Sequence, residues 1–428
     1  MSQEQNEAFA KPTVNGNRFA ARRIELPPIL GNKVYSAEKL LLARMMEILG
    51  SPPLDLELWD GQEIASSRRP PVARILIRDR GALLKLLANA ELGFGEMYAE
   101  DRIEVQGDLV DCIEAIYRAL PRTEHGLIGQ MLLAPFSAPL RNTLPRARRN
   151  IHHHYDIGND FYKLWLDREM VYTCAYFSDP AMDLEQAQAA KLDYVCRKLR
   201  LARGETVLET GCGWGALALH MARHHGVIVK AYNISEEQIA YARKSALAQG
   251  LEGRVEFIED DYRNARGDFD AFVSVGMLEH VGIDQYQALG TVIERNLKDA
   301  GRGLIHSIGR DRPAPTTPWI ERNIFPGACP PSLSQMTQIF EPFGFSVLDV
   351  ENLRLHYAKT LEHWLSRYEA NIESVTQMFD PEFVRAWRLY LSGSLAAFRS
   401  GDMQLFQVSF ARSGNNAIPW TRHHLYAS

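Results

Sequence analysis

The chain has 428 residues, of which 46% are hydrophobic and 24% are charged, and its formal net charge is −5. This mildly acidic composition argues against a nucleic-acid partner. No apolar run approaches the roughly 18 residues of a membrane span, so any membrane contact is expected to be peripheral. The cysteine count of five is odd, no CxxC pair occurs, and the first residues are polar. These features favour a reducing, cytoplasmic location.

The sequence of the N-terminal quarter of the chain predicts a terminal segment followed by a small domain. Residues 1–24 are polar and are expected to form a flexible N-terminus. Residues 25–122 combine strand-like runs, VARILIRD and EDRIEVQGD, with helical runs, ALLKLLANAEL and LVDCIEAIYRAL. Gly93 and Gly95 are expected to break the helical pattern between them. We interpret residues 25–122 as a small α+β domain without catalytic residues, suited to lipid, membrane or dimer contact.

A linker is predicted over residues 123–149. Its prolines exclude one long helix, and an apolar piece, LIGQMLLAPF, precedes a basic cluster made of Arg141, Arg146, Arg148 and Arg149. One hypothesis is that these arginines contact anionic lipid, at about 1 kcal/mol each. A solvated linker between two domains explains the same pattern. The histidines at 152–154 do not predict a metal site, because adjacent histidines on one helix point in different directions.

Residues 150–428 are expected to form the main domain. After Ala181 short apolar strands alternate with helical segments, and the strand-like runs are ETVLET, VIVKAYNI, RVEFIEDD, FDAFVSVG and RGLIHSIG. Such alternation predicts an α/β fold with a doubly wound, mostly parallel sheet.

The stretch VLETGCGWGALAL places three glycines between a strand and a helix. A P-loop is excluded because no Gly-Lys-Ser/Thr follows. A dinucleotide site needs G-x-G-x-x-G and an acid about 20 residues later, whereas Asn233 stands where that acid is expected. G-x-G-x-G preceded by an acid, here Glu209, is typical of S-adenosylmethionine sites. That ligand must lie flat on the backbone, so a Cβ at Gly211, Gly213 or Gly215 would intrude; a glycine-rich turn without a ligand is the alternative.

Ligands of open parallel sheets bind beyond the carboxyl ends of the strands. This rule selects Asp260, Asp261 and Tyr262 after the third strand. There an aromatic ring can stack on adenine and a carboxylate can accept a hydrogen bond from its amino group. It also selects Glu279 after the fourth strand and His306 near the end of the fifth. We expect all of these groups to meet at one rim of the sheet.

Between residues 150 and 412 the chain contains HHHYDIGNDFYKLWLD, YTCAYF, GCGWG, FVSVGMLEHVG, LIHSIG, WIERNIFPGACPPS and MQLFQVSFAR, in that order. In these blocks it resembles the cyclopropane-fatty-acyl-phospholipid synthases and the related mycolic acid cyclopropane synthases. The resemblance implies a Rossmann-like class I S-adenosylmethionine-dependent methyltransferase with a smaller N-terminal domain. It implies methylene transfer to the cis double bond of an unsaturated acyl chain in a membrane phospholipid. It also implies a homodimer in the cytoplasm, peripheral at the inner face of the membrane.

The resemblance also implies roles for individual residues. The product is a cyclopropane, formed through a carbocation that bound bicarbonate deprotonates. By position, the groups that hold this ion are Cys174, Glu279, His306, Tyr357 and the backbone amide of Ile308. The residues that match cofactor-binding positions are Tyr172, Gly211, Gly213, Gln238, Asp261 and Tyr262. Taken singly, the cysteine and the histidine are equally typical of ordinary core positions.

At three places the chain departs from the family pattern. Glu209-Thr210 replaces the usual Asp-Ile before the first glycine, Asn233-Ile234 replaces Thr-Leu after the second strand, and Thr173 replaces a serine. Asparagine and threonine still form the hydrogen bonds needed to bind the cofactor. Since relatives stop at a methyl or methylene branch after the same first step, a branch-forming C-methyltransferase is the alternative. A non-catalytic lipid- or cofactor-binding protein is a third possibility.

Overall fold

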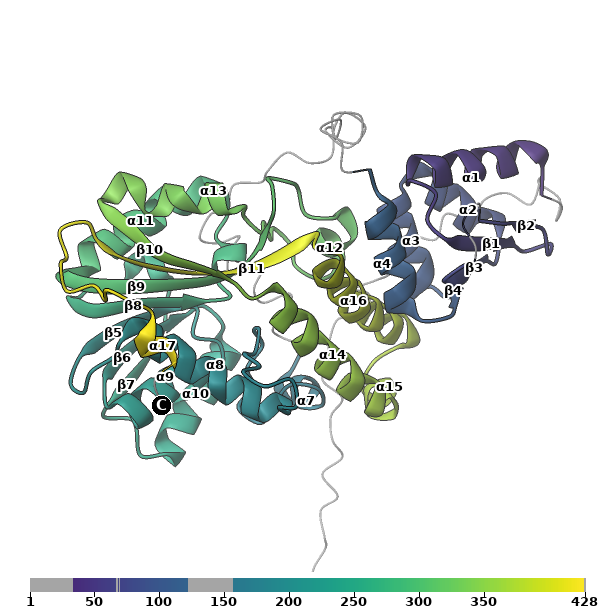
Figure 1. The fold of residues 1–428 in the computed structure, drawn as a ribbon. Coiled ribbons are helices and arrows are strands. Elements are labelled where there is room, and N and C mark those ends of the chain that lie inside the picture. The colour runs from purple at the N-terminus through teal and green to yellow at the C-terminus, as the bar shows by residue number, and fades with distance from the viewer. Residues whose placement is uncertain (1–33, 67, 69, 122–156, 427–428) are drawn as a thin grey trace, which may run out of the picture.

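The computed structural model describes residues 34–66, 68, 70–121 and 157–426 (Figure 1). The predicted flexible N-terminus, the whole predicted linker with its arginine cluster, and the three adjacent histidines lie outside these residues. Among the helices in the described part of the chain, none is long and apolar enough to cross a membrane.

The N-terminal part is a small α+β domain, as the sequence pattern predicted. A four-stranded sheet has the order β2-β1-β3-β4, in which β1 is parallel and β4 antiparallel to β3. The last three helices each begin at an Asp or Asn side chain that accepts a backbone N–H. The elements are α1 Ser36–Ile48, β1 Leu54–Leu58, β2 Glu63–Ile64, β3 Ala73–Ile77, α2 Arg80–Ala88, α3 Ala90–Ala99, β4 Ile103–Gln106 and α4 Leu109–Ala119.

The expectation that Gly93 and Gly95 break the helical pattern is wrong, because both lie inside α3. A Cβ on Gly93 would stand 2.5 Å from the carbonyl oxygen of Lys85, and one on Gly95 would stand 2.2 Å from Cδ1 of Trp319. Glycine therefore lets α3 approach its neighbours closely, at a cost of about 1 kcal/mol in helix propensity. The break falls at Asn89, whose extended backbone ends α2 and whose side chain caps α3.

The C-terminal part is built on a seven-stranded sheet of order β10-β11-β9-β8-β5-β6-β7. Strands β9, β8, β5, β6 and β7 are parallel to one another. At the edge, β11 pairs antiparallel with β9, and β10 pairs antiparallel with β11. Figure 1 shows helices on both faces of this sheet, which confirms the doubly wound fold. The strands are β5 Thr206–Thr210, β6 Ile228–Asn233, β7 Val255–Glu259, β8 Phe269–Val275, β9 Leu297–Arg310, β10 Phe345–Asn352 and β11 Met403–Arg412.

The helices of this part cover the sheet and extend beyond one end of it. The α-helices are α7 Asn159–Lys163, α8 Leu184–Leu199, α9 Ala216–His220, α10 Glu236–Ala248, α11 Tyr286–Asn296, α12 Pro318–Asn323, α13 Leu333–Met336, α14 Arg354–Ala370, α15 Ile372–Met378, α16 Pro381–Ser400 and α17 His423–Tyr426. A π-helical turn, Met221–His225, continues α9, and a short 3-10 turn, Leu278–His280, follows β8.

The two parts share one hydrophobic core. Helices α14, α15 and α16 are inserted between β10 and β11, and α3 and α4 of the N-terminal domain pack on α16 (Figure 1). Tyr98 and Val110 from the N-terminal domain belong to the same buried cluster as Trp165 and Trp387. The N-terminal domain is therefore held in a fixed position beside the carboxyl end of the main sheet.

Candidate active site

The loop after β5 presents its backbone to a pocket at the carboxyl end of the sheet. Gly211, Gly213 and Gly215 have φ angles of +78°, +54° and +90°, which favour glycine. A Cβ on Gly211 would stand 2.7 Å from Cβ of Met277, and one on Gly215 would stand 2.6 Å from Cζ of Phe257. A Cβ on Gly213 would meet no protein atom within 4 Å. The expectation that all three glycines make room for a ligand is wrong for Gly215. A side chain at Gly215 is excluded by contact with Phe257.

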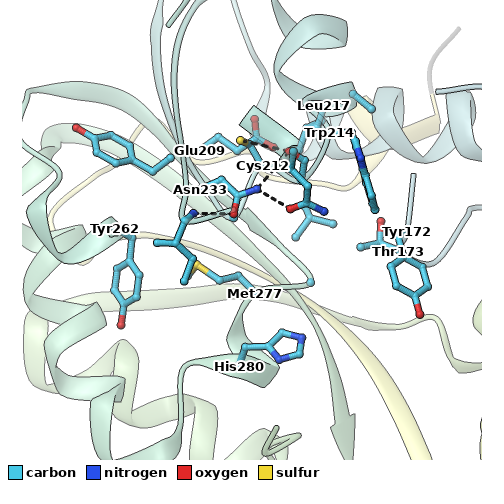
Figure 2. Close-up of a pocket in the computed structure, with 18 of the residues that line it drawn as sticks. Tyr172, Thr173, Glu209, Cys212, Trp214, Leu217, Asn233, Tyr262, Met277 and His280 are labelled. Carbon is cyan, nitrogen blue, oxygen red and sulfur yellow. Dashed lines mark hydrogen bonds between the residues drawn. The ribbon is translucent and has the colours of Figure 1, made fainter. Parts of the chain in front are cut away.

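This first cavity, here called the cofactor pocket, is formed by the segment before α8 and by the loops after β5, β6, β7 and β8. Figure 2 shows Thr173, Tyr172 and Trp214 on one side of it and Tyr262 on the other. Every residue that the sequence assigned to the cofactor lines it: Tyr172, Thr173, Glu209, Gly211, Gly213, Asn233, Ile234, Gln238, Asp261 and Tyr262.

Asn233 organises the loop after β6. Its Oδ1 accepts hydrogen bonds from the backbone N–H of Ile234 at 2.8 Å and of Ser235 at 3.3 Å. Its Nδ2 donates to Oε1 of Gln238 at 2.7 Å and to the carbonyl oxygen of Gly213 at 3.3 Å. The asparagine that replaces the family's threonine therefore ties the glycine loop to the start of α10.

The carboxylate of Asp261 is held by Arg263 through two side-chain contacts, Oδ1–Nε at 2.8 Å and Oδ2–Nη2 at 3.0 Å. The guanidinium of Arg263 also lies 5.5 Å from the centroid of the Tyr262 ring. Arginine thus fixes both the carboxylate and the aromatic ring that were expected to contact adenine.

Two buried ionisable groups, Glu209 and Lys191, stand at the inner end of the cofactor pocket. Nζ of Lys191 donates to Oγ1 of Thr173 at 2.9 Å. Burial raises the pKa of Glu209 to about 8 and lowers the pKa of Lys191 to about 8. Oε2 of Glu209 has no hydrogen-bond partner among the described residues. A ligand with a cationic amino group would favour the ionised form of Glu209 and could donate a hydrogen bond to it.

Sequence reasoning missed Lys191. The available signal was its place on α8, because Lys191 lies in the same buried stripe as Leu184, Ala187 and Gln188. A lysine inside a buried stripe is rare unless its charge has a partner.

A second cavity, here called the apolar cavity, has a volume of about 320 Å³. It extends from the carboxyl end of the sheet to α1, β1, β3 and α4 of the N-terminal domain. Every residue assigned to catalysis lines it: Cys174, Glu279, His306, Ile308 and Tyr357. The sequence analysis placed no pocket residue in the N-terminal domain, yet that domain contributes Met45, Met46, Leu49, Leu56, Ile75, Phe94 and Ile113.

The cofactor pocket and the apolar cavity meet at Tyr172, Thr173, Gly276 and His280, which line both. Gly276 has a φ of +75°, and a Cβ there would stand 2.7 Å from Cγ2 of Thr173. Burial lowers the pKa of His280 to about 4, so its imidazole is neutral at pH 7. Groups bound in the two cavities can therefore meet at an uncharged junction.

Glu279 and His306 present buried polar atoms to the apolar cavity. Oε1 of Glu279 accepts the backbone N–H of Ile308 at 2.6 Å, and Nδ1 of His306 lies 3.0 Å from Nε2 of Gln407. With this amide as the donor, the proton of a neutral His306 resides on Nε2. Within the described part of the chain, Oε2 of Glu279 and Nε2 of His306 have no hydrogen-bond partner.

Burial sets the charges of Glu279, His306 and Cys174. It raises the pKa of Glu279 to about 7 and lowers the pKa of His306 well below its usual value. It also raises the pKa of Cys174, so that group is a neutral thiol, which donates to the carbonyl oxygen of Ala175 at 3.1 Å. The Ile308 amide, which the resemblance assigned to the ion, is bonded to Glu279 in this structure. It therefore positions that carboxyl group.

Comparison with known proteins decides the family. The family model described as mycolic acid cyclopropane synthetase matches residues 142–408. The chain belongs to the mycolic acid cyclopropane synthetase family. A second model, described as a domain of unknown function, matches residues 41–123, which correspond to the N-terminal domain.

Named relatives agree with this family. The cyclopropane-fatty-acyl-phospholipid synthase of Escherichia coli K12 is 37% identical over 371 residues, covering 85% of this chain and 94% of the relative. A probable fatty acid methyltransferase of Pseudomonas putida is 35% identical over 385 residues, covering 87% and 96%. The mycolic acid cyclopropane synthase CmaA1, solved with SAH and CTAB, has 30% identity and a TM-score of 0.59, covering 61% of this chain and 97% of that one. The protein is thus an S-adenosylmethionine-dependent methyltransferase of the cyclopropane synthase family.

Glu209→Gln is expected to weaken binding of S-adenosylmethionine about 10- to 100-fold, because it removes a charge-assisted hydrogen bond worth about 1.5–3 kcal/mol. Isothermal titration calorimetry measures the change. Glu237→Gln is the control, since Glu237 is an exposed carboxylate on α10, and its Kd should equal that of the wild type. Equal affinity of Glu209→Gln and wild type would contradict the assignment of Glu209 to the cofactor.

Proposed function

We propose that this methyltransferase transfers a methylene group from S-adenosylmethionine to the cis double bond of an unsaturated acyl chain in a membrane phospholipid. The observation that supports the proposal most strongly is that the cofactor pocket and the apolar cavity adjoin each other and share Tyr172, Thr173, Gly276 and His280 in their linings. An alkene is a weak nucleophile, so the rate must come from its alignment with the sulfonium methyl group. Alignment in a site without water contributes on the order of 7–11 kcal/mol.

In the proposed reaction the methyl group bonds to one alkene carbon, and S-adenosylhomocysteine leaves with the sulfur's electron pair. The other alkene carbon becomes a carbocation, and loss of one methyl proton to a base closes the cyclopropane ring. Such a cation is acidic enough for a weak base, provided that water does not trap it first. The apolar lining of the cavity would keep water away from it.

Bicarbonate could form hydrogen bonds with Oε2 of Glu279 and Nε2 of His306, which have no partner among the described residues. The ion would supply the base. Nε2–H of His306 is available as a donor, and an ionised Oε2 of Glu279 can accept from a hydroxyl group. The hydroxyl of Tyr357 and the thiol of Cys174 line the same cavity. Because the thiol and the imidazole are neutral, they would leave the negative charge of a bound ion facing the developing positive charge on carbon.

A branch-forming C-methyltransferase acting on unsaturated acyl chains is the second candidate. The name of the Pseudomonas putida relative, a probable fatty acid methyltransferase, favours it. Both reactions share the first step and differ in the fate of the cation: proton loss with ring closure gives the cyclopropane, whereas proton loss that forms a double bond gives an unsaturated branched chain. Cys174, Glu279 and His306 are all present around one cavity, which argues against a third possibility, a protein that binds lipid or cofactor without catalysis.

Mass spectrometry of the lipid product tests the proposal. The purified chain is incubated with S-adenosylmethionine and vesicles of a cis-monounsaturated phosphatidylglycerol. We expect the acyl chain to gain the mass of one CH₂ group, and the product to keep its mass on catalytic hydrogenation, because a ring has no double bond. A product of the same mass that takes up hydrogen would indicate an unsaturated branch. No mass gain would contradict catalysis on this lipid.

The pH dependence of turnover tests Glu279. If its ionised form accepts a hydrogen bond from the bound ion, kcat/KM should fall as the pH drops through about 7, where the raised pKa of Glu279 lies. Glu279→Gln should lower kcat about 100-fold or more and abolish this fall of kcat/KM at low pH. Its Kd for S-adenosylmethionine should be unchanged. Glu259→Gln, an exposed carboxylate at the end of β7, is the control. A fully active Glu279→Gln variant would exclude Glu279 from the mechanism.

We further propose that α1 contacts the membrane surface. Three of its apolar residues are exposed, Leu40 at 72%, Leu41 at 56% and Ile48 at 65%. The same helix provides Met45 and Met46 to the apolar cavity. A lipid tail that leaves a bilayer beside α1 would thus enter the cavity directly. The homodimer and the cytoplasmic position at the inner face of the membrane stay predictions from the family resemblance.

Vesicle sedimentation tests the role of α1. The triple variant Leu40→Gln, Leu41→Gln, Ile48→Gln should bind phospholipid vesicles about 10-fold or more weakly, since burying each side chain contributes about 1.5 kcal/mol or more. Leu247→Gln is the matched control, because Leu247 is 67% exposed on α10 of the main domain. Both variants should bind S-adenosylmethionine as the wild type does. Unchanged vesicle binding by the triple variant would remove α1 from the docking surface.

A further inference from the structure

Three metal-ligating side chains meet away from the two cavities, where α8 packs against α9 and the turn that follows it. Cys196 lies on α8, His220 is the last residue of α9, and His225 ends the π-helical turn. One ligand atom from each lies within 4.8 Å of the other two. The thiol is fully buried and both imidazoles are partly buried.

The two imidazoles have buried nitrogens that the described residues leave unsatisfied. Nε2 of His220 and Nε2 of His225 have no hydrogen-bond partner among those residues, and the ring centroids are 6.1 Å apart. A buried polar atom without a partner costs about 1–3 kcal/mol. A neutral imidazole can use the lone pair of such a nitrogen to bind a cation.

The backbone conformation brings these histidines together. In a regular α-helix, residues five apart point about 140° away from each other. The π-helical turn Met221–His225 has i→i+5 geometry, which turns His225 toward the side of His220. π-helical turns are rare and frequently occur at functional sites. The unusual backbone and the two Nε2 atoms that lack a hydrogen-bond partner among the described residues are thus two separate observations at one place.

We propose that Cys196, His220 and His225 bind a zinc ion. Zinc binds thiolate and imidazole ligands tetrahedrally at about 2.3 and 2.0 Å, which needs ligand atoms about 3.3–3.6 Å apart. The three ligand atoms now lie within 4.8 Å of one another, so metal binding would require the side chains to move closer together. Oδ1 of Asp193 lies 3.7 Å from Nε2 of His225, and the fourth position would be taken by this carboxylate or by a water molecule. Oδ2 of Asp193 lies 2.8 Å from Nε of Arg197, which would hold the carboxylate in place.

The position of the site indicates a structural role. The ion would join α8 to α9, and Ala216 and Leu217 at the start of α9 line the cofactor pocket. Lys191, which also lines that pocket, lies on α8 one and a half turns before Cys196. Zinc would therefore hold two walls of the pocket together. Binding replaces the thiol proton of Cys196, so one proton passes to the solvent for each ion bound.

Cobalt spectroscopy tests the proposal, because Co²⁺ substitutes for zinc and absorbs visible light. The experiment uses the full chain without a histidine tag and with His152→Ala, His153→Ala and His154→Ala, so that these adjacent histidines cannot bind the metal. Added Co²⁺ should give a thiolate-to-cobalt charge-transfer band and tetrahedral d–d absorption, both saturating at one equivalent. Added Zn²⁺ should abolish both signals and raise the melting temperature.

Variants identify the ligands. Cys196→Ser should lose the charge-transfer band, and His220→Gln or His225→Gln should bind Co²⁺ at least about 10-fold more weakly. Cys112→Ser, a buried cysteine of the N-terminal domain, and His224→Gln, an exposed neighbour, are the matched controls and should bind normally. A band that persists in Cys196→Ser would overturn the proposal. So would the absence of a thiolate band at one equivalent in the parent chain, whether or not the Cys196 variant folds.

Discussion

Burial of the residues around the junction between the two cavities is the constraint on which the other features of the site depend. At that junction Tyr172, Thr173, Gly276 and His280 line both the cofactor pocket and the apolar cavity. Burial there changes the ionisation of the nearby groups. It keeps His280 and His306 neutral and brings the pKa of Glu279 to about 7. The same desolvation strengthens any interaction between a bound anion and a cation that forms on carbon.

Packing from distant parts of the chain buries this junction. The side chains of Tyr162, Trp165 and Tyr172 lie within one aromatic cluster with Trp364 and Trp387. The last two come from α14 and α16, which are inserted between the edge strands (Figure 1). Helices α3 and α4 then close the far side of the cavity by packing on α16. The small N-terminal domain therefore forms part of the lining of the apolar cavity.

The features that could be predicted best are those formed by residues close together in the sequence. The strand, the glycine loop and the helix follow one another in the chain, so the positions of Gly211 and Gly213 could be predicted from spacing. Glu279 and His306 could be placed at the same rim because parallel strands end at one edge. Family motifs added Cys174 and Tyr357, which no spacing rule selects.

Features that depend on packing between distant segments could not be predicted. Whether Gly95 breaks or continues a helix depends on Trp319, which lies far along the chain. The N-terminal lining of the apolar cavity depends on how α4 meets α16. The approach of Cys196 to His220 and His225 depends on a π-helical turn, for which a single sequence has no reliable signal. Lys191 was missed because only the tertiary structure places its ammonium group beside Oγ1 of Thr173 at the cofactor pocket.

The most direct test of the central claim is a crystal structure of the chain with S-adenosylhomocysteine and a cis-unsaturated phospholipid. The account predicts the cofactor's sulfur in the cofactor pocket and the double bond in van der Waals range of it, beside Thr173 and Gly276. The rest of the acyl chain should pass along α4 toward α1, with no ordered water at the junction. A lipid tail bound elsewhere, or a junction open to bulk water, would contradict it.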